Sequence, residues 1–197
     1  LSRGPVMVYY GQEVGEPADV GAAGFELDKG RTTFFDFWSV PELQKWINGG
    51  KYDGGSLSNE QKELRSFYGR LVRSLSHPAL VQGNFYPLNP ANRDNSNYGK
   101  LDRKEPGHWL YSFLRHDPVA KKSVLVVANL HPKDSISKAN LKLSSDAAAA
   151  VTTSPDATVK GEDLLSLANP PSISCPAKDL TTSGFPLPDL PPLSAAY

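Results

Sequence analysis

The stretch from Gly4 to Glu13 constrains the fold more than any other part of the sequence. It opens with a Gly-Pro pair, which favours a turn, and continues with five apolar or aromatic residues at positions 6–10. A short apolar run without alternation, bounded by turn residues, predicts a strand buried on both faces, as in a parallel sheet. Gln12 and Glu13 follow directly at its carboxyl end, where parallel α/β sheets usually carry their chemistry.

Two helices are predicted after a loop over residues 14–30 and an aromatic cluster over 31–38. The first begins at Ser39, with Glu42 three residues on to complete a capping box, and ends at a Gly-Gly pair. The second begins at Ser58, where Gln61 closes another capping box, and Pro78 stops it. Its apolar residues recur at helical spacing, which predicts burial of one face. They are Leu64, Phe67, Tyr68, Leu71, Val72 and Leu75.

Beyond residue 80, strand-like segments alternate with turn residues, which is typical of an antiparallel β-sandwich. Over 108–115 both alternating sets of side chains are largely apolar, so we expect one face to meet another sheet or domain. The tail over 184–193 holds four prolines and predicts an edge strand or an extended cover. The predicted strands are 80–88, 108–115, 123–129, 140–143, 148–153, 172–175 and 184–193.

Composition excludes several classes of partner. Lys plus Arg and Asp plus Glu both number 21, so no basic excess favours nucleic acid, and no apolar run has the length of a membrane helix. The one cysteine, Cys175, excludes an internal disulfide, and the four histidines lack metal-ligand spacing. His77 lies at the predicted helix end, where a cation would suit the helix dipole.

Five segments together resemble the end of the α-amylase family, glycoside hydrolase family 13. Residues 4–13 are similar to the last barrel strand of that family, and 31–46 to a loop and helix of some bacterial branches. Residues 73–80 resemble the exit of the last helix, 124–129 an aliphatic strand ending in Asn, and 190–194 the closing strand of the final domain. The resemblance covers nearly the whole chain and weakens over 91–104 and 144–178.

The resemblance implies an α+β fragment of a longer protein. Residues 1–79 would be the end of a (β/α)8 TIM barrel, with its eighth strand, a loop and two helices. Residues 80–197 would be the C-terminal antiparallel β-sandwich domain. A signal peptide would lie upstream of residue 1, so compartment stays open, with a secreted, periplasmic or cytoplasmic location all compatible.

The resemblance also implies the chemistry of the parent protein, a retaining glycosidase acting on starch, glycogen or maltooligosaccharides. That reaction needs two carboxyl groups about 5–5.5 Å apart. In the family these and a third carboxylate lie on strands four, five and seven, whose motifs this sequence lacks. We therefore expect no catalytic residue and no metal ligand in this chain, and no activity of the segment alone. The parent's use of calcium stays open.

Five residues are candidates for contact with an α-glucan or for support of the neighbouring site. Tyr10, Gln12 and Glu13 follow the strand motif, and for Glu13 we favour hydrogen bonding to adjacent strand ends over contact with sugar. Arg31 is a candidate for a sugar hydroxyl or for pairing with an acid in the same loop. Trp38 is a candidate for stacking on a pyranose ring or for packing on the barrel rim.

Two alternatives remain at this point. In the first alternative, the chain is a carbohydrate-binding or structural β module without catalysis, with Trp38 and Trp109 as candidate sugar contacts. Alternatively the fold is retained and the parent is an α-glucan transglycosylase of the branching or glucanotransferase type, because the same carboxylates serve both reactions. In the main interpretation the partners are an α-glucan and the upstream part of the same barrel.

Overall fold

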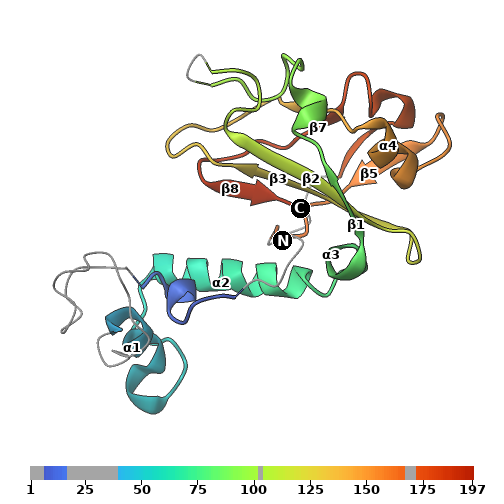
Figure 1. Cartoon of the computed structure of the whole chain (residues 1–197). Helices are drawn as coiled ribbons and strands as arrows, with labels where there is room; N and C mark the ends of the chain where they lie inside the picture. The colour runs from blue at the N-terminus through green and yellow to red at the C-terminus, as the bar shows by residue number, and fades with distance from the viewer. Residues whose placement is uncertain (1–6, 17–39, 102–103, 167–171) are drawn as a thin grey trace. The chain divides into compact units, whose positions relative to one another are not determined.

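The computed structural model describes residues 7–16, 40–101, 104–166 and 172–197, and the chain divides into two compact units, Leu1–Val72 and Arg73–Tyr197 (Figure 1). Arg31 and Trp38 lie outside the described residues. Together the described parts form a mixed α+β structure with an antiparallel sheet. The predicted domain boundary after residue 79 stays a prediction.

The first unit is helical in its described parts. Its elements are the 3-10 turn η1 (Gln12–Val14), helix α1 (Pro41–Ile47), the 3-10 turn η3 (Asn48–Gly50) and helix α2 (Asn59–Ser74), whose last two residues belong to the second unit. Both predicted helices are therefore confirmed. Along α2 the predicted apolar stripe is half-buried from Leu64 to Leu71, whereas Val72 and Leu75 are more exposed.

The buried strand predicted over residues 6–10 is wrong for its described part. Met7 to Tyr9 have no regular structure, Tyr10 begins a turn, and the Met7 side chain is 88% exposed. The physical reason is non-local: a strand of a parallel sheet is held by hydrogen bonds to neighbouring strands, and the described part of this unit contains none. An apolar run alone supplies no such partner.

The second unit is built on a four-stranded antiparallel sheet in the order β1-β2-β3-β8 (Figure 1). The long central pair runs in continuous register from Leu110 opposite Asn129 to Asp117 opposite Lys122. Two two-stranded ribbons, β4-β7 and β5-β6, complete the described sheet structure. The strands are β1 (Asn84–Pro87), β2 (Leu110–Asp117), β3 (Lys122–Asn129), β4 (Asn140–Leu141), β5 (Thr158–Gly161), β6 (Ile173–Pro176), β7 (Phe185–Pro186) and β8 (Ser194–Ala196).

The core of this unit lies between the sheet and the ribbons. It joins Leu114 of β2 and Val127 of β3 to Leu141 of β4, Cys175 of β6 and Phe185 of β7. Each fully buried aliphatic side chain of this kind contributes about 1.5–3 kcal/mol to folding. The two-layer packing is compatible with the predicted sandwich.

The second face of the sheet is also apolar, as the sequence predicted. Phe113 alternates with the core residues Leu110 and Leu114 along β2 and is only 3% exposed. Val124 and Val126 of β3 are equally buried and stand opposite Arg115 and Phe113 in the register, outside the main core. The ring of Phe113 stacks on that of Phe85 of β1 at 5.0 Å.

Two predicted strands are wrong in part. Residues 148–153 belong mostly to helix α4 (Ser145–Val151), because a run of alanines after the N-cap Ser144 favours helix over strand. The strand predicted from Leu80 begins only at Asn84, because Pro78 starts the short helix α3 (Pro78–Gln82). Strand β5 was not predicted. The two remaining short elements are η4 (Pro90–Asn92) and η5 (Ala177–Asp179).

The proline-rich tail behaves as predicted. Strand β7 pairs with β4 over only two residues, and Leu190 makes an isolated bridge with Ile136. Prolines cannot donate to a ladder, so the tail covers the core through side chains such as Leu187 and Leu190 more than through continuous pairing.

Candidate functional site

The turn that carries Tyr10, Gln12 and Glu13 is tight and is fixed by its own backbone. Gly11 has φ +86°, and a Cβ there would lie 2.9 Å from the Cβ of Glu16, so only glycine fits without a shift. The amides of Val14 and Glu16 both donate to the carbonyl of Gly11 at 3.0 Å. The backbone therefore sets which side chains this turn displays.

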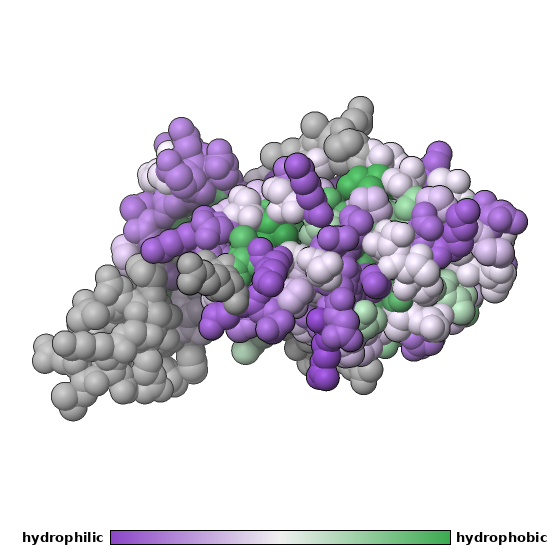
Figure 2. All heavy atoms as spheres, turned by 90° about the horizontal axis from the view of Figure 1, so that it is seen from above, coloured by the Kyte–Doolittle hydropathy of each residue, from purple (hydrophilic) through white to green (hydrophobic). Residues whose placement is uncertain are grey.

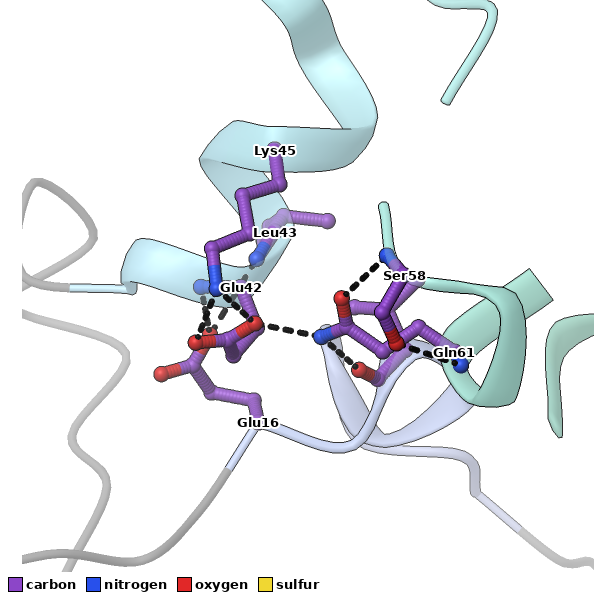
Figure 3. A network of polar contacts seen from close by, with 7 residues as sticks. Glu16, Glu42, Leu43, Lys45, Ser58 and Gln61 are labelled. Atoms are coloured by element: carbon purple, nitrogen blue, oxygen red, sulfur yellow. Dashed lines mark hydrogen bonds and ion pairs between the residues drawn. The ribbon is translucent and has the colours of Figure 1, made fainter. Parts of the chain in front are cut away.

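Glu16 joins this turn to the start of α1. Its carboxylate accepts hydrogen bonds from the backbone amides of Glu42 at 2.8 Å and Leu43 at 3.1 Å (Figure 3). Amides at a helix start lack partners within the helix and carry partial positive charge, so an anion suits them. The N-cap residue is Val40, with no side-chain cap bond. The predicted cap residue Ser39 lies outside the described residues, and in the described part Glu16 caps the helix from a distant part of the chain.

Gln61 joins the turn to both helices. As predicted, its amide donates to the Ser58 hydroxyl at 3.2 Å while its side-chain oxygen accepts from the Ser58 amide at 3.0 Å. Its Nε2 also donates to the Val14 carbonyl at 3.0 Å and to the carboxylate of Glu42 (Figure 3). One side chain thereby completes the cap of α2 and ties η1 to α1.

The Glu42 carboxylate is held in its ionised form. Lys45 donates to its two oxygens at 2.8 and 2.6 Å. This bond to Lys45, more than the bond from Gln61, lowers the pKa of Glu42 below its ordinary value against the opposing effect of desolvation. Glu42 is therefore a charged structural acceptor at neutral pH.

The described candidates from the sequence lie together on this turn. Tyr10 is half-buried with its ring 4.9 Å from that of Tyr9, and the side-chain oxygen of Gln12 accepts from the Tyr9 amide at 3.2 Å. Glu13 makes no hydrogen bond or ion pair with another described residue. The supporting role predicted for Glu13 stays a prediction.

The acids around this turn do not form an acid/base pair. The Glu16 carboxylate accepts hydrogen bonds from two backbone amides. The Glu42 carboxylate accepts from the side chains of Lys45 and Gln61. No group of three His, Cys, Asp or Glu residues that could hold a metal is found within the described ranges. Among the helices of the described chain, none has the length and apolar character of a membrane span.

His77 differs from its prediction. It precedes helix α3 as the N-cap, and its Nδ1 accepts a hydrogen bond from the Ala79 amide at 3.3 Å. An accepting nitrogen requires the neutral ring. Burial, and to a smaller extent the charge of Lys122, lower the pKa of His77. The cationic role at a helix end is therefore wrong.

Sequence reasoning missed a set of buried polar residues in the second unit. Asn92, fully buried, donates to the carbonyls of Leu88 and Lys142 at 2.8 Å and accepts from the amides of Lys142 and Asn95. Asn129 similarly donates to three backbone carbonyls. The three-residue spacing of Asn89, Asn92 and Asn95 was the available signal. These residues fix loops through hydrogen bonds to the backbone.

Trp109 is a packing residue. Its ring meets the rings of His108 and His131 edge to face at 4.9 and 4.8 Å and lies half-buried against the main core. His131 in turn accepts from the amides of Lys133 and Asp134 through Nδ1. Trp109 is therefore not displayed as a sugar platform.

The second unit contains a cavity of about 520 Å³ between the sheet and the β5-β6 ribbon. Its walls are mainly aliphatic, with Leu125 and Val127 of β3 opposite Val159 and Ile173 of the ribbon, and Lys160 and Asp163 are among its polar lining residues. On the face shown in Figure 2, hydrophobic residues form small groups between hydrophilic ones.

Comparison with known proteins adds no relative: no family model, no curated protein and no solved structure matches this chain.

Proposed function

We propose that this chain is the C-terminal part of a retaining glycoside hydrolase that acts on α-glucans, with the catalytic carboxylates on an upstream part of the same protein. The observation that carries the proposal is the sequence order. A Tyr-Tyr-Gly-Gln-Glu turn, an aromatic loop and two capped helices precede an antiparallel β unit, in the order in which α-amylase-family proteins end.

Two features support an upstream part of a barrel as partner. Met7 and Val8 are exposed although their apolar character suits a strand buried on both faces. Glu13 has no partner among the described residues, and the turn that presents it is fixed by Gly11, Glu16 and Gln61. A strand added beside residues 6–10 would bury Met7 and Val8, and it would bring hydrogen-bond donors to the carboxylate of Glu13.

The test is an assay of the complete protein that contains this chain, on soluble starch and maltooligosaccharides. We expect reducing ends to be released, with the α configuration retained in the first product by proton nuclear magnetic resonance. The 197-residue chain alone should release none. Cleavage by the isolated chain, or no cleavage or transfer by the complete protein, would contradict the proposal. Transfer products in place of hydrolysis would identify the transglycosylase alternative.

The non-catalytic alternative is favoured by one observation, an exposed aromatic residue after α1. Tyr52 is 62% exposed and packs edge-on against Trp46. Glucan binding without cleavage by the complete protein would support a binding module.

A further inference from the structure

The cavity of the second unit lies where the sheet has an uncovered edge. Strand β8 pairs with β3 only from Val127 to Asn129, so residues 122–126 of β3 have no strand on that side in the described chain. The cavity of about 520 Å³ follows this edge, since residues 122–125 and Val127 line it. Five residue steps of a strand span roughly 17 Å, so the cavity offers room for an elongated ligand.

Backbone hydrogen bonds keep β8 away from the rest of this edge. The Tyr197 amide donates to the Asp163 carboxylate at 3.2 Å, and the Tyr197 carbonyl accepts from the Leu164 amide at 2.9 Å. The Asp163 carboxylate also accepts from the Leu165 amide at 3.0 Å. The residue after β8 is thus attached to the segment after β5 and not to β3. The negative charge of Asp163 is occupied by these amides.

The walls of the cavity are apolar and only partly buried. Leu125 of β3, Val151 of α4, Val159 of β5 and Ile173 of β6 line it, and each is half-buried while it packs on the main core. Leu164, which also lines the cavity, is 42% exposed. An apolar ligand in this space would remove these side chains from water. The volume is within the range of about 300–1,000 Å³ that is usual for small-molecule sites.

Two hydrogen-bond donors lie together at one end of the cavity. The Nδ1 of His77 accepts from the Ala79 amide at 3.3 Å, so the neutral ring carries its proton on Nε2. That Nε2–H makes no hydrogen bond with another described residue. Burial, and then the charge of Lys122, lower the pKa of His77, which shows that Lys122 is close to the ring. Both residues line the cavity.

Lys122 is the charged member of this pair. It is exposed, and its ammonium makes no hydrogen bond or ion pair with another described residue. Asp117, opposite in the register, is engaged by amides of its own turn. The charges of Lys160 and Glu162, which also line the cavity, are opposite in sign. A carboxylate is the group best suited to accept from an ammonium and an imidazole N–H together.

We propose that this cavity binds a fatty acid, an aliphatic chain that ends in a carboxylate. The chain lies along β3 against the apolar walls, and the carboxylate accepts hydrogen bonds from Lys122 Nζ and His77 Nε2. All residues of the site belong to the second unit. The proposal therefore does not depend on the proposed glycosidase function.

The experiment is isothermal titration calorimetry of the complete protein with decanoate and with decanol, below the concentrations at which they aggregate. Two temperatures are used, since apolar burial contributes little enthalpy near room temperature. We expect one decanoate per chain. Lys122→Ala should weaken decanoate binding about tenfold, the loss of one charge-assisted hydrogen bond, and leave decanol binding unchanged. The matched control is Lys121→Ala, the neighbouring exposed lysine outside the cavity lining, which should bind as the wild type does.

A second variant tests the cavity itself. Val159→Trp places an indole in the space that the aliphatic chain would occupy, so binding of both decanoate and decanol should be lost. Circular dichroism and the thermal midpoint establish that this variant is folded. Lys122→Ala changes an exposed residue and decides the question if Val159→Trp does not fold.

Each outcome bears on the site directly. No binding of decanoate at either temperature, or equal affinities of the wild type and a folded Val159→Trp, would overturn the fatty-acid site. Equal decanoate affinities of Lys122→Ala and Lys121→Ala would overturn the assigned carboxylate end. Decanoate binding that depends on Lys122, by a complete protein that does not cleave starch, would support the site and contradict only the hydrolase.

Discussion

The side chain of Gln61 connects three elements of the first unit through hydrogen bonds. Its side chain completes the cap of α2, donates to the Val14 carbonyl and reaches the Glu42 carboxylate. No other described side chain joins η1, α1 and α2 together. Gln61 thus makes both a local helix cap and hydrogen bonds to residues far away in the sequence.

Replacing Gln61 by Ala should lower the free energy of unfolding by about 1–2 kcal/mol, because a helix cap and two long-range hydrogen bonds are lost together. Gln61→Glu should do no better, since a carboxylate cannot donate to Val14 and would face Glu42. Urea unfolding followed by circular dichroism measures the change. The neighbouring Lys62→Ala, on the exposed side of α2, is the control and should leave the midpoint nearly unchanged.

In the second unit, Asn92→Ala should cost about 2–3 kcal/mol, because it leaves backbone groups of Leu88 and Lys142 buried without partners. Asn92→Asp should not restore stability, as its new oxygen would face two carbonyls. The thermal midpoint is the measurement, with the exposed Asn97→Ala as control. A midpoint for Asn92→Ala equal to that of the control would contradict the structural role assigned to Asn92.

At the scale of the element, the turn between β2 and β3 is fastened by one carboxylate. Asp117 accepts from the amides of Val119 at 2.8 Å and Ala120 at 3.2 Å, and from the Gln82 side chain on α3 at 2.9 Å. The bond from Gln82, followed by those from the backbone amides, lowers the pKa of Asp117 below 3.8. The same group therefore closes a hairpin and attaches a helix to it.

A pH dependence follows for this hairpin. Because the folded-state pKa is below the unfolded value of 3.8, the stabilisation by Asp117 is fully present above that pH and is lost as the pH falls through the folded pKa. The difference in unfolding free energy between wild type and Asp117→Ala should accordingly be constant near neutrality and shrink in acid. Val119→Ala, exposed in the same turn, should show no comparable change. A difference that stays constant down to strongly acidic pH would contradict the assignment.

The success of sequence prediction depended on how local each interaction is. The cap of α2 uses Ser58 and Gln61, three residues apart, and was predicted correctly. The cap of α1 comes from Glu16, far away in the chain, and no local motif announces it. Residues 148–153 were predicted as a strand, whereas the alanine run before and within them makes most of the segment part of helix α4. Strand β5 is short, with Gly161 at its end, and gave too little pattern to detect.

The candidate site shows the same limit. Tyr10 was predicted as the last residue of a strand, with Gln12 and Glu13 directly after it, whereas the structure has all three on one turn. The strand before them was wrong, because its formation depends on neighbours that the sequence of the segment itself does not contain. The packing of Tyr52 and Arg65 against Trp46 joins α1, its following loop and α2, and periodicity does not predict such contacts.

At the scale of the whole molecule, the proposal of an upstream barrel predicts a change in amide hydrogen exchange. In the 197-residue chain the amides of Met7 and Val8 should exchange rapidly, because they belong to no strand. In the complete protein these amides should be protected by pairing with a neighbouring strand. Amides of β2 and β3 should be protected in both and serve as the internal control. Rapid exchange of Met7 and Val8 in the complete protein would contradict the barrel.

The bond from Gln61 to Val14 has a consequence for the order of events during synthesis. The two residues are 47 positions apart, so the ribosome must add the whole of α1 and the first turn of α2 before the bond can form. Closing a loop of that length carries an entropic cost that the helices must first offset. The attachment of this turn to α2 therefore forms later than the local backbone hydrogen bonds that close the turn itself.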